Sequence, residues 1–422
     1  MNDHPGRIAV LTVGDELLAG EVADSNLGTI GKALSAMGMS VWEHATVRDD
    51  VQAISTAIKD FLETNDAVLI TGGLGPTSDD VTREAVADAT GKRLESRKAL
   101  ETMIRGFFES MDREMPEENL KQALIPCGAR AIPPAGGTAP GFIVEYGGKL
   151  IAALPGVPRE MERMLRSDVK GELGSRFSSG EFTVTLRVNT FGAGESDVAQ
   201  ELHDLIGGCA VRYGFLALNG PIVVKLTATA GSREEAERLA ADEREKVVGR
   251  LGPLVYGFGD ETMEEVMGRL LLERGLSIAV AESLTAGMVC SRIANVPGSS
   301  DYFRGGVVTY SRESKEEVLG LPKELLREGA VNQGVARAMA ESVRRMFSAD
   351  LGVATTGLAG PGRDGEKKTV GTLCLALADG KDTGSWERML PGDRELVRSI
   401  ATMAAMNVIR LYVLHGDQVV AD

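Results

Sequence analysis

The chain has 422 residues and a formal net charge of −15, with 43% hydrophobic and 25% charged residues. That length exceeds what one hydrophobic core supports, so we expect a globular protein of two or three domains. The negative charge argues against a protein that grips nucleic acid through a basic face. No apolar run approaches the roughly 20 residues of a membrane span, and no signal peptide is expected, so we predict a cytoplasmic protein.

Cysteine and histidine are both scarce. The four cysteines form no CxxC pair, so neither a disulfide framework nor a thiolate zinc site is expected from Cys127, Cys209, Cys290 and Cys374. The four histidines are scattered along the chain, at His4, His44, His203 and His415. A nucleophilic serine in the last third of the chain would therefore need a base other than histidine.

The first third of the chain alternates between predicted strands and helices. A continuous apolar, β-branched run predicts a buried strand over 7–13, and further strands are expected over 39–47, 66–71 and 149–154, with helical patterns between the first three. Strands and helices in this order are typical of a parallel sheet covered by helices on both faces. We assign residues 1–168 to this domain.

Two polar loops follow strands of this domain and are expected to meet beyond the strand ends. The first begins at Asp15-Glu16, and the second is the glycine-rich segment 72–80, which ends in Asp79 and Asp80. Glycines let the backbone approach a phosphate closely, and the carboxylates can hold a divalent cation. The structural alternative is that Thr77 and Asp80 form a helix capping box and the acids complement the helix dipole.

Residues 169–258 show a different pattern of predicted strands and helices from the first domain and form a predicted α+β module. Strands are expected at 182–191 and 221–229, with helices at 195–206 and 234–251. The module has neither a basic stripe nor an aromatic platform, which RNA-binding folds of this size use. We therefore expect a spacer or a dimer-building element, and we do not expect nucleic-acid binding.

The third domain, residues 259–418, contains the stretch around which the function is organised. A strand over Leu276–Ala281 breaks into Glu282-Ser283-Leu284-Thr285 and then into a helix at about 286–294. A serine at such a turn lies beside unpaired backbone N–H groups and can act as a nucleophile. The alternative is that Ser283 simply caps the helix, a position where serine is favoured.

Two pairs of residues elsewhere in this domain bear on that choice. Tyr310 precedes Lys315, and a lysine whose pKa is lowered by burial can serve as the base for a serine; the alternative is a solvated surface lysine. Arg394 and Arg398 lie one turn apart at the start of the last helix. A cation there opposes the helix dipole, so a bound anion such as a phosphate would explain both arginines.

A glycine-rich loop over 355–365 follows a predicted strand. Its Gly360-x-Gly362-x-x-Gly365 spacing matches a dinucleotide-binding fingerprint. The next predicted element is a strand over 370–378, whereas the fingerprint requires a helix, so that interpretation fails. The loop can still hold a phosphate through its backbone amides.

Taken in order, these motifs resemble those of the bacterial competence/damage-inducible CinA proteins over nearly the whole chain. In the first domain the matching segments are Gly14-Asp15-Glu16-Leu17-Leu18, Gly72-Gly73-Leu74-Gly75-Pro76-Thr77, Gly137–Gly141 and Leu154–Pro158. In the third domain they are Ala281-Glu282-Ser283, Gly305-Gly306, Tyr310–Lys315, Gly357–Pro361, Val370–Thr372 and Gly392-Asp393-Arg394. The middle module is similar to the family's KH-like linker domain, including Gly194-Glu195-Ser196.

The resemblance implies an α/β multidomain protein: a molybdopterin-binding-like domain, a small α+β KH-like domain and a C-terminal α/β deamidase domain. The last is similar to nicotinamide mononucleotide deamidases, which implies Ser283 as nucleophile and Lys315 as base, helped by Tyr310, without a cofactor. The substrate-binding residues implied there are Thr285, Gly305, Gly306, Thr356, Gly357, Ala359, Gly360, Arg394 and Arg398.

For the first domain the resemblance implies metal-dependent hydrolysis of the pyrophosphate bond of ADP-ribose. The divalent metal would be held by Asp79, Asp80 and Glu16, and the nucleotide by Gly72, Gly73, Gly75, Thr77, Asp15 and Asn26. The expected partners are these two small nucleotides and a second copy of the chain in a homodimer, with neither membrane nor nucleic acid. Both reactions belong to the salvage of pyridine-nucleotide breakdown products.

The chain departs from the family pattern at several positions. Leu284 and Ala286 stand where the family usually has Cys and Gly, and Ala286 narrows the backbone freedom of the turn. Thr369 and Pro134 replace a usual proline and asparagine. An alternative function is therefore a pterin- or nucleotide-binding regulatory protein whose third domain is inactive.

Overall fold

The computed structural model describes residues 6–177, 182–207, 210–327, 329–362 and 368–416. The chain divides into two compact units. The first contains the residues up to Val184 with Thr229–Glu237, and the second contains Thr185–Ala228 and the residues from Arg238 onward. Several positions considered above lie outside the described residues: His4, Cys209, Gly365 and the predicted domain boundary at 418.

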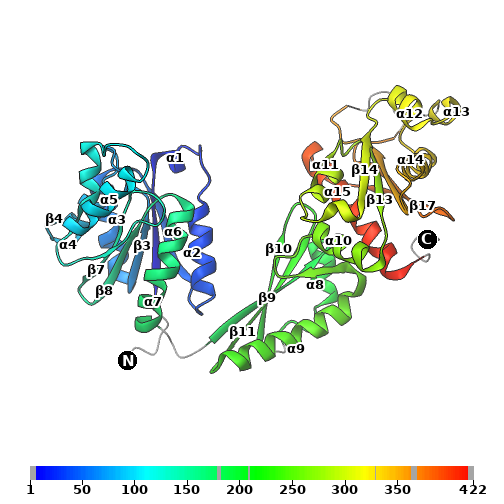
Figure 1. Ribbon diagram of the computed structural model, residues 1–422. Helices are drawn as coiled ribbons and strands as arrows, with labels where there is room; N and C mark the ends of the chain where they lie inside the picture. Colours follow the sequence, from blue (N-terminus) through cyan, green and yellow to red (C-terminus); the bar gives the residue numbers. More distant parts are fainter. Residues whose placement is uncertain (1–5, 178–181, 208–209, 328, 363–367, 417–422) are drawn as a thin grey trace. The chain divides into compact units, whose positions relative to one another are not determined.

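The first unit is built on a six-stranded sheet (Figure 1). Its strands are Ile8–Val13 (β1), Val41–Val47 (β2), Ala67–Thr71 (β3), Arg130–Ile132 (β6), Gly141–Tyr146 (β7) and Lys149–Leu154 (β8), in the order β2-β1-β3-β8-β7-β6. The first three strands and β8 run parallel, whereas β7 and β6 continue the sheet antiparallel. A separate pair joins Leu94–Ser96 (β4) to Leu124–Pro126 (β5).

Helices cover both faces of this sheet, as the alternating pattern predicted. One face carries Ser25–Ser35 (α2), Pro158–Met164 (α6), the π-helix Leu165–Val169 and Lys170–Phe177 (α7); the other carries Val51–Thr64 (α3), Thr82–Thr90 (α4) and Lys98–Glu109 (α5). Short helices span Asp15–Leu18 (α1) and Glu117–Ala123. Successive side chains of β1 point to opposite faces of the sheet. Ala9 and Leu11 therefore pack in the core on one face, and Ile8 and Val10 pack in the core on the other. Burial on both faces explains the continuous apolar run of this strand.

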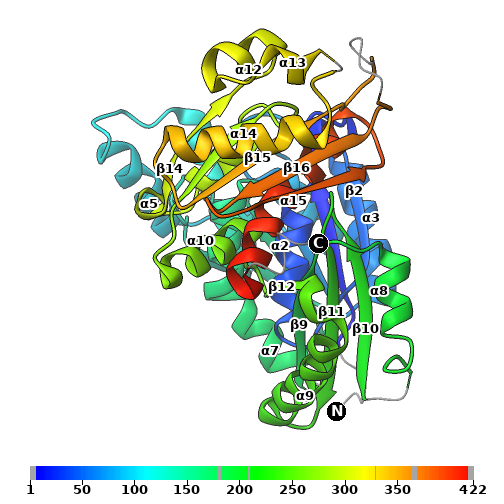
Figure 2. The same ribbon diagram turned by 90° about the vertical axis from the view of Figure 1, so that its right-hand side faces the viewer.

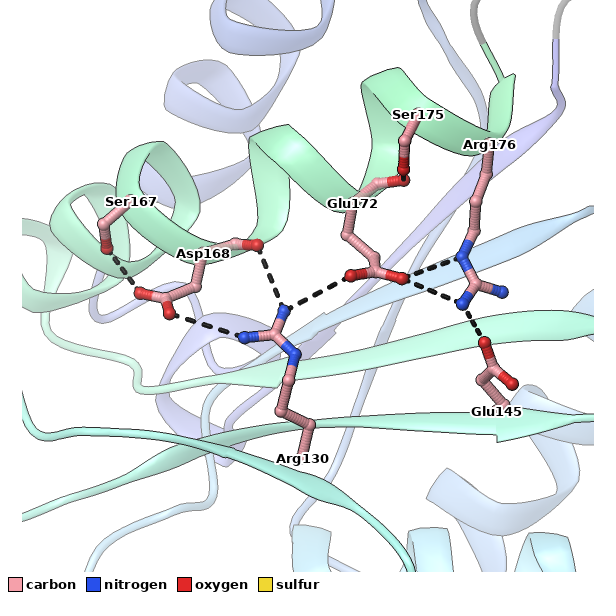
Figure 3. Close-up of polar contacts among 7 residues, drawn as sticks. All are labelled: Arg130, Glu145, Ser167, Asp168, Glu172, Ser175 and Arg176. Carbon is pink, nitrogen blue, oxygen red and sulfur yellow. Dashed lines mark hydrogen bonds and ion pairs between the residues drawn. The ribbon is translucent and has the colours of Figure 1, made fainter.

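Ion pairs fasten α7 and the π-helix to the antiparallel end of the sheet (Figure 3). Arg130 on β6 lies 3.5 Å from Asp168 and 3.6 Å from Glu172. Arg176 donates from Nε to Glu172 at 2.8 Å and also pairs with Glu145 on β7. These side chains remain partly exposed, so each pair contributes less than about 1 kcal/mol.

The KH-like module contains four antiparallel strands and two helices. The strands are Phe182–Thr190 (β9), Val211–Ala217 (β10), Ile222–Ala230 (β11) and Val255–Phe258 (β12), in the order β10-β11-β9-β12. The helices are Glu195–Glu201 (α8) and Arg233–Leu251 (α9), with a 3₁₀ turn at Gly252–Leu254. The sequence reading missed β10 and β12 and made α8 too long by about one turn.

The C-terminal domain has a five-stranded sheet between two helical layers. Its strands are Ile278–Glu282 (β13), Phe303–Val308 (β14), Leu351–Gly357 (β15), Thr372–Ala378 (β16) and Thr383–Met389 (β17), in the order β14-β13-β15-β16-β17. Gln333–Met346 (α14) packs on one face (Figure 2). Met263–Arg274 (α10), Met288–Ala294 (α11) and Arg394–His415 (α15) pack on the other. Arg312–Leu319 (α12), Lys323–Leu326 (α13) and the 3₁₀ turn Ser299–Asp301 complete the domain.

Strand β14 begins four residues earlier than the predicted strand at 307–310. Glycine disfavours strands, so Gly305 and Gly306 concealed it. Here the two glycines permit close packing, since a Cβ on Gly305 would lie 2.5 Å from the Phe347 ring and one on Gly306 2.4 Å from Cys290 Sγ.

Among the described residues, α15 is the one helix whose length and composition would allow it to cross a membrane, with a mean hydropathy of 1.3 over its most apolar window. More than half of that window, 56%, is buried inside the domain. Its apolar residues, including Val397, Met406 and Ile409, form part of the domain core. This is the behaviour of a core helix in a globular domain.

Candidate active site

Ser283 lies at the carboxyl end of β13, where the chain turns toward α11. Its N–H donates to the Thr355 carbonyl at 2.9 Å, which fixes the residue to the neighbouring strand β15. The turn then passes through two left-handed residues, Ala286 (φ 49°) and Gly287 (φ 92°), before the helix begins at Met288. The helix therefore starts two residues later than predicted, because left-handed residues cannot belong to it.

The buried carboxylate of Glu282 serves the start of α11. It accepts hydrogen bonds from the N–H groups of Gly287 and Cys290 at 2.8 Å and of Val289 at 3.2 Å. The N-cap residue of α11 is Gly287, and Glu282 accepts from the N–H groups at this end of the helix. The hydroxyl of Ser283 therefore does not serve as the cap. Burial and the Glu282 carboxylate raise the pKa of the Cys290 thiol, which makes it a poor nucleophile.

Lys315 is buried against Ser283. Its Nζ lies 2.9 Å from Ser283 Oγ and 2.7 Å from the Thr309 carbonyl, with only 1% of the residue exposed. The alternative of a solvated surface lysine therefore does not apply. Helix α12 presents the lysine, and Ser311 caps that helix by accepting from the Ser314 N–H at 3.1 Å.

A cavity of about 270 Å³ opens beside this pair. Ser283 and Lys315 line it together with Thr356 and with the loop residues Gly357, Ala359 and Gly360. Its described lining includes the basic side chains of Arg312, Lys315 and Arg394 and no Asp or Glu. A cavity with this charge favours an anionic ligand.

Arg394 and Tyr310 form a bridge at the cavity. The arginine donates from Nη1 to the Gly360 carbonyl at 2.6 Å and from Nη2 to the Tyr310 hydroxyl at 2.7 Å. The tyrosine ring is 56% exposed, and its hydroxyl contacts Arg394 rather than Ser283 or Lys315. The Tyr310 hydroxyl therefore lies with Arg394 at the cavity, whereas the Tyr310 carbonyl lies 3.4 Å from Lys315 Nζ.

Arg398 has different partners from Arg394. Its Nε donates to the Leu284 carbonyl at 3.1 Å and its Nη2 to the Thr285 carbonyl at 3.0 Å. It lines a neighbouring open pocket with Met288, Arg394 and Glu395. The structure thus does not bring both predicted arginines to the cavity.

Three other predicted substrate-binding residues also lie away from the cavity lining. Gly305 and Gly306 lie within β14, where they permit close packing. Thr285 is fully buried, and its hydroxyl pairs with that of Thr355 at 2.7 Å. Thr356 does line the cavity, but its hydroxyl already donates to the Ala330 carbonyl at 2.9 Å.

A second candidate site lies in the first unit, where the loops after its parallel strands meet. Asn26 donates from Nδ2 to Thr71 Oγ1 and to the Gly156 carbonyl, both at 2.8 Å. The Asp15 N–H donates to Asp49 at 2.9 Å, joining the loops after β1 and β2. The two loops predicted to converge, those after β1 and β3, also approach each other, since a Cβ on Gly72 would lie 2.1 Å from the Val13 carbonyl oxygen.

The glycine loop after β3 is held by its own side chains. Asp80 accepts from the Gly75 N–H at 2.7 Å, from the Thr77 N–H at 2.9 Å and from the Thr77 hydroxyl. Beneath the loop, the buried Arg83 guanidinium donates to the carbonyls of Leu74 and Gly75. Helix α4 begins only at Thr82, so Thr77 and Asp80 close the loop and are not the capping box of that helix.

Glycine is required at two positions of this loop. A Cβ on Gly72 would lie 2.1 Å from the Val13 carbonyl oxygen, and one on Gly73 would lie 2.3 Å from Thr82 Oγ1; both residues have positive φ. These glycines therefore let the loop pass close to β1 and to the start of α4. Their backbone conformation is one that other residues rarely adopt.

The predicted metal ligands do not form a ready ligand set. No group of three or more His, Cys, Asp or Glu side chains within the described ranges is placed to hold a metal ion. Asp80 is engaged by the loop, whereas the charges of Asp79 and Glu16 act on a further carboxylate, Asp49. Burial raises the pKa of Asp49, and the charges of Glu16, Asp15 and Asp79 raise it further.

Asp49 was missed by the sequence reading, although the rule that located Asp15 applies to it. It follows the strand predicted at 39–47, and its carboxylate lies at the same edge of the sheet. Glu282 was read only as part of a motif, and nothing in the pattern revealed that it caps α11. Its burial at a strand end could be seen only in the folded chain.

Comparisons with known proteins agree with this architecture. Residues 9–174 match the probable molybdopterin binding domain, 185–257 the damage-inducible protein CinA KH domain, and 260–413 the CinA C-terminal domain. The CinA-like protein of Geobacter sulfurreducens is 42% identical over 409 residues, covering 96% of this chain and 98% of the relative. A putative competence-damage inducible protein of Desulforudis audaxviator is 39% identical over 407 residues, covering 96% and 98%.

This chain belongs to the CinA family. The predicted fold class is confirmed, with a molybdopterin-binding-like domain, a KH-like α+β domain and a C-terminal α/β domain. A solved structure of CinA from Thermoplasma acidophilum is similar to part of the chain, at 36% identity and a TM-score of 0.38, covering 41% of this chain and 99% of that one.

Proposed function

We propose that the C-terminal domain is a Ser/Lys amidohydrolase that converts nicotinamide mononucleotide to nicotinate mononucleotide and ammonia. The observation that carries the proposal is the 2.9 Å contact between the buried Lys315 Nζ and Ser283 Oγ. The basic lining of the cavity supports a substrate that bears a phosphate. A volume of about 270 Å³ lies near the lower end for ligand sites and suits a mononucleotide better than a dinucleotide.

In the first half-reaction, Ser283 Oγ attacks the carboxamide carbon while Lys315, as a neutral amine, takes the hydroxyl proton. A neutral Nζ has two N–H groups and one lone pair. An N–H of the neutral Nζ donates to the Thr309 carbonyl, 2.7 Å away, and the Ser283 hydroxyl, 2.9 Å away, donates to the lone pair. The carbon–nitrogen bond then breaks, the proton on Lys315 passes to the leaving nitrogen, and ammonia departs from an ester on Ser283.

In the second half-reaction, Lys315 takes a proton from water as the water oxygen attacks the ester carbon. The bond to Ser283 Oγ breaks, the serine recovers its proton from Lys315, and the acid is released. Backbone N–H groups of the turn stabilise the oxyanion in both steps. Arg394 and Arg312 attract the ribose phosphate, and Tyr310 orients Arg394 through the hydrogen bond between them.

Ammonia release from nicotinamide mononucleotide tests this proposal. With a chelator present, the wild-type protein is expected to release ammonia, and Ser283→Ala is expected to lose at least about 10³-fold in kcat. Ser291→Ala, on the exposed side of α11, is the matched control and should retain wild-type activity. Unchanged release by Ser283→Ala would contradict the proposal, and so would release by neither protein.

For the first unit we propose hydrolysis of the pyrophosphate bond of ADP-ribose with a divalent metal ion. The supporting observation is Asp49, whose pKa is raised in part by Glu16, Asp15 and Asp79, since such a site favours a cation. Mg²⁺ commonly binds through one or two carboxylates plus substrate phosphates, which fits a site with no preformed ligand set. When bound, the ion would supply charge neutralisation; Asn26 and the Gly72–Thr77 loop would bind the nucleotide.

This second activity is tested by following AMP formation from ADP-ribose. We expect activity with Mg²⁺ or Mn²⁺, loss with a chelator, and no effect of Ser283→Ala. Asp49→Asn should weaken the metal dependence by shifting half-activation to higher metal concentration. Equal activity with and without chelator would refute the metal requirement, and binding without turnover would favour the regulatory alternative.

A further inference from the structure

The turn that carries Ser283 is held from two sides by oppositely charged groups. On one side the Glu282 carboxylate accepts from the N–H groups at the start of α11. On the other side Arg398 donates to the carbonyls of Leu284 and Thr285 at 3.1 and 3.0 Å. N–H groups at the end of the turn therefore pair with Glu282, whereas two of its carbonyls pair with Arg398.

The hydrogen bond from Arg398 to the Leu284 carbonyl also determines the direction of the Thr285 N–H, which belongs to the same peptide unit. In a trans peptide unit the C=O and the next N–H point in opposite directions, so the Thr285 N–H points away from Arg398. The Ser283 N–H is already bonded to the Thr355 carbonyl, and the Ala286 N–H to the Ser283 carbonyl. No described residue accepts a hydrogen bond from the Thr285 N–H. Because Thr285 is fully buried, water does not pair with this N–H either, so the group lacks an acceptor until a ligand atom reaches the turn.

Arg398 also strengthens that donor. A hydrogen bond from a cation to a peptide oxygen polarises the whole peptide unit and makes its N–H a better donor. Arg394, one turn earlier, instead contacts the Gly360 carbonyl and the Tyr310 hydroxyl and lines the cavity. The two arginines at the start of α15 therefore have different surroundings, although their residue type and spacing offer no reason to separate them.

We propose that Arg398 is a positioning residue that orients the Leu284–Thr285 peptide, so that the Thr285 N–H stabilises the oxyanion formed when Ser283 attacks. This inference rests on the proposed amidohydrolase function. It replaces the expectation that Arg398 binds the substrate phosphate. Arg394 remains the arginine that faces the ligand.

The test compares Arg398→Met, Arg398→Lys and Arg394→Met in the full chain, with Arg345→Met on the exposed side of α14 as control. Loss of a single oxyanion donor lowers kcat by about 10²–10³, so a misoriented donor in Arg398→Met should lower kcat at least about 10-fold. The KM for nicotinamide mononucleotide should stay within about threefold. Arg398→Lys should recover part of kcat, because an ammonium can still reach one carbonyl, whereas Arg394→Met should mainly raise KM.

A fluorophosphonate probe separates this inference from the proposed substrate. The probe phosphonylates an activated serine through a transition state that also develops an oxyanion, so its rate constant at Ser283 should fall with Arg398→Met and partly return with Arg398→Lys. Far-ultraviolet circular dichroism checks that each variant is folded; if Arg398→Met is not, Arg398→Lys alone must show the reduced rate. Phosphonylation at the wild-type rate in folded Arg398 variants, or a raised KM with unchanged kcat, would overturn the inference. Arg398-dependent phosphonylation without ammonia release would contradict only the proposed substrate.

Discussion

At the residue scale, Ala286 is the position where this chain strains its own active-site turn. A non-glycine residue with φ 49° carries a penalty of about 1 kcal/mol or more, because its Cβ crowds the backbone. The residue is exposed, so burial of the methyl group does little to offset this cost. The strain sits three residues after Ser283, in the turn whose N–H groups are proposed to act in catalysis.

Ala286→Gly is therefore expected to stabilise the second unit by about 1 kcal/mol. Urea unfolding followed by tryptophan fluorescence measures this change, because Trp386 belongs to the C-terminal domain. Ala338→Gly, inside α14, is the control and should cost about 1 kcal/mol, since its backbone is helical. Destabilisation by Ala286→Gly would show that the left-handed conformation is not strained.

Asp350 predicts how the stability of this unit depends on pH. Its carboxylate accepts from the Ser277 hydroxyl at 2.6 Å and from the Ser277 N–H at 2.8 Å, and these bonds hold its pKa below 3.8. A carboxyl whose pKa is lowered by folding stabilises the protein above its unfolded value, near 3.9, and loses that contribution as the pH falls through the folded value. Asp350→Asn should cost less than about 1 kcal/mol at pH 7.

Unfolding free energies of the wild type and of Asp350→Asn, measured by urea titration between pH 2.5 and 7, test this dependence. The two curves should converge as the pH falls below about 4. A constant difference across the whole range would mean that the carboxylate charge contributes nothing to the Ser277 contact.

At the scale of elements, α15 joins the KH-like module to the C-terminal domain through a buried arginine. Arg410 donates to the carbonyls of Pro253 at 2.6 Å and Val255 at 3.0 Å, and from Nε to Asn407 at 2.9 Å. Burial lowers the pKa of Arg410 to about 10, because removing the charged guanidinium from water costs free energy. Three hydrogen bonds offset this cost, and they tie the 3₁₀ turn after α9 and the start of β12 to the helix that carries Arg394 and Arg398.

Arg410→Met is expected to destabilise the second unit by about 1 to 2 kcal/mol, because two partly buried carbonyls lose their donor. Arg238→Met removes an exposed i,i+4 pair with Asp242 on α9 and should change stability by less than about 0.5 kcal/mol. Chemical unfolding of both variants provides the comparison. Stabilisation by Arg410→Met would mean that the desolvation of the guanidinium exceeds the value of its bonds.

Much of the fold could be predicted from the hydrophobic periodicity and from the glycines and prolines that end helices and strands. The incorrect predictions have physical causes. The continuous apolar strands of the parallel sheets were located within two residues, because both faces are buried. Strand β14 was misplaced because its central glycines serve packing against Phe347 and Cys290. At the site, the pairing of Ser283 with Lys315 could be predicted from the family motifs. The partners of Arg398 could not, because they are backbone carbonyls whose directions depend on the left-handed turn and not on residue type.

At the scale of the whole molecule, the two proposed hydrolytic sites lie in two separate compact units. The proposed C-terminal site uses a serine, a lysine and water, whereas the proposed N-terminal site uses carboxylates with a metal ion. The two activities should therefore respond independently to a chelator and to Ser283→Ala. The KH-like module contributes to the C-terminal unit through Phe191, which packs in that domain's core, and through Asn219, whose carbonyl accepts from Ser399 at 3.3 Å beside Arg398.

The most direct test of the central claim is to quench the wild-type protein during turnover of nicotinamide mononucleotide and to locate the modified residue by peptide mass spectrometry. We expect an acyl adduct, equal to the substrate minus ammonia, on the peptide that contains Ser283, and none in Ser283→Ala. Ammonia release at the wild-type rate by Ser283→Ala, or an adduct on a different residue, would contradict the assignment of Ser283 and Lys315 as the catalytic pair.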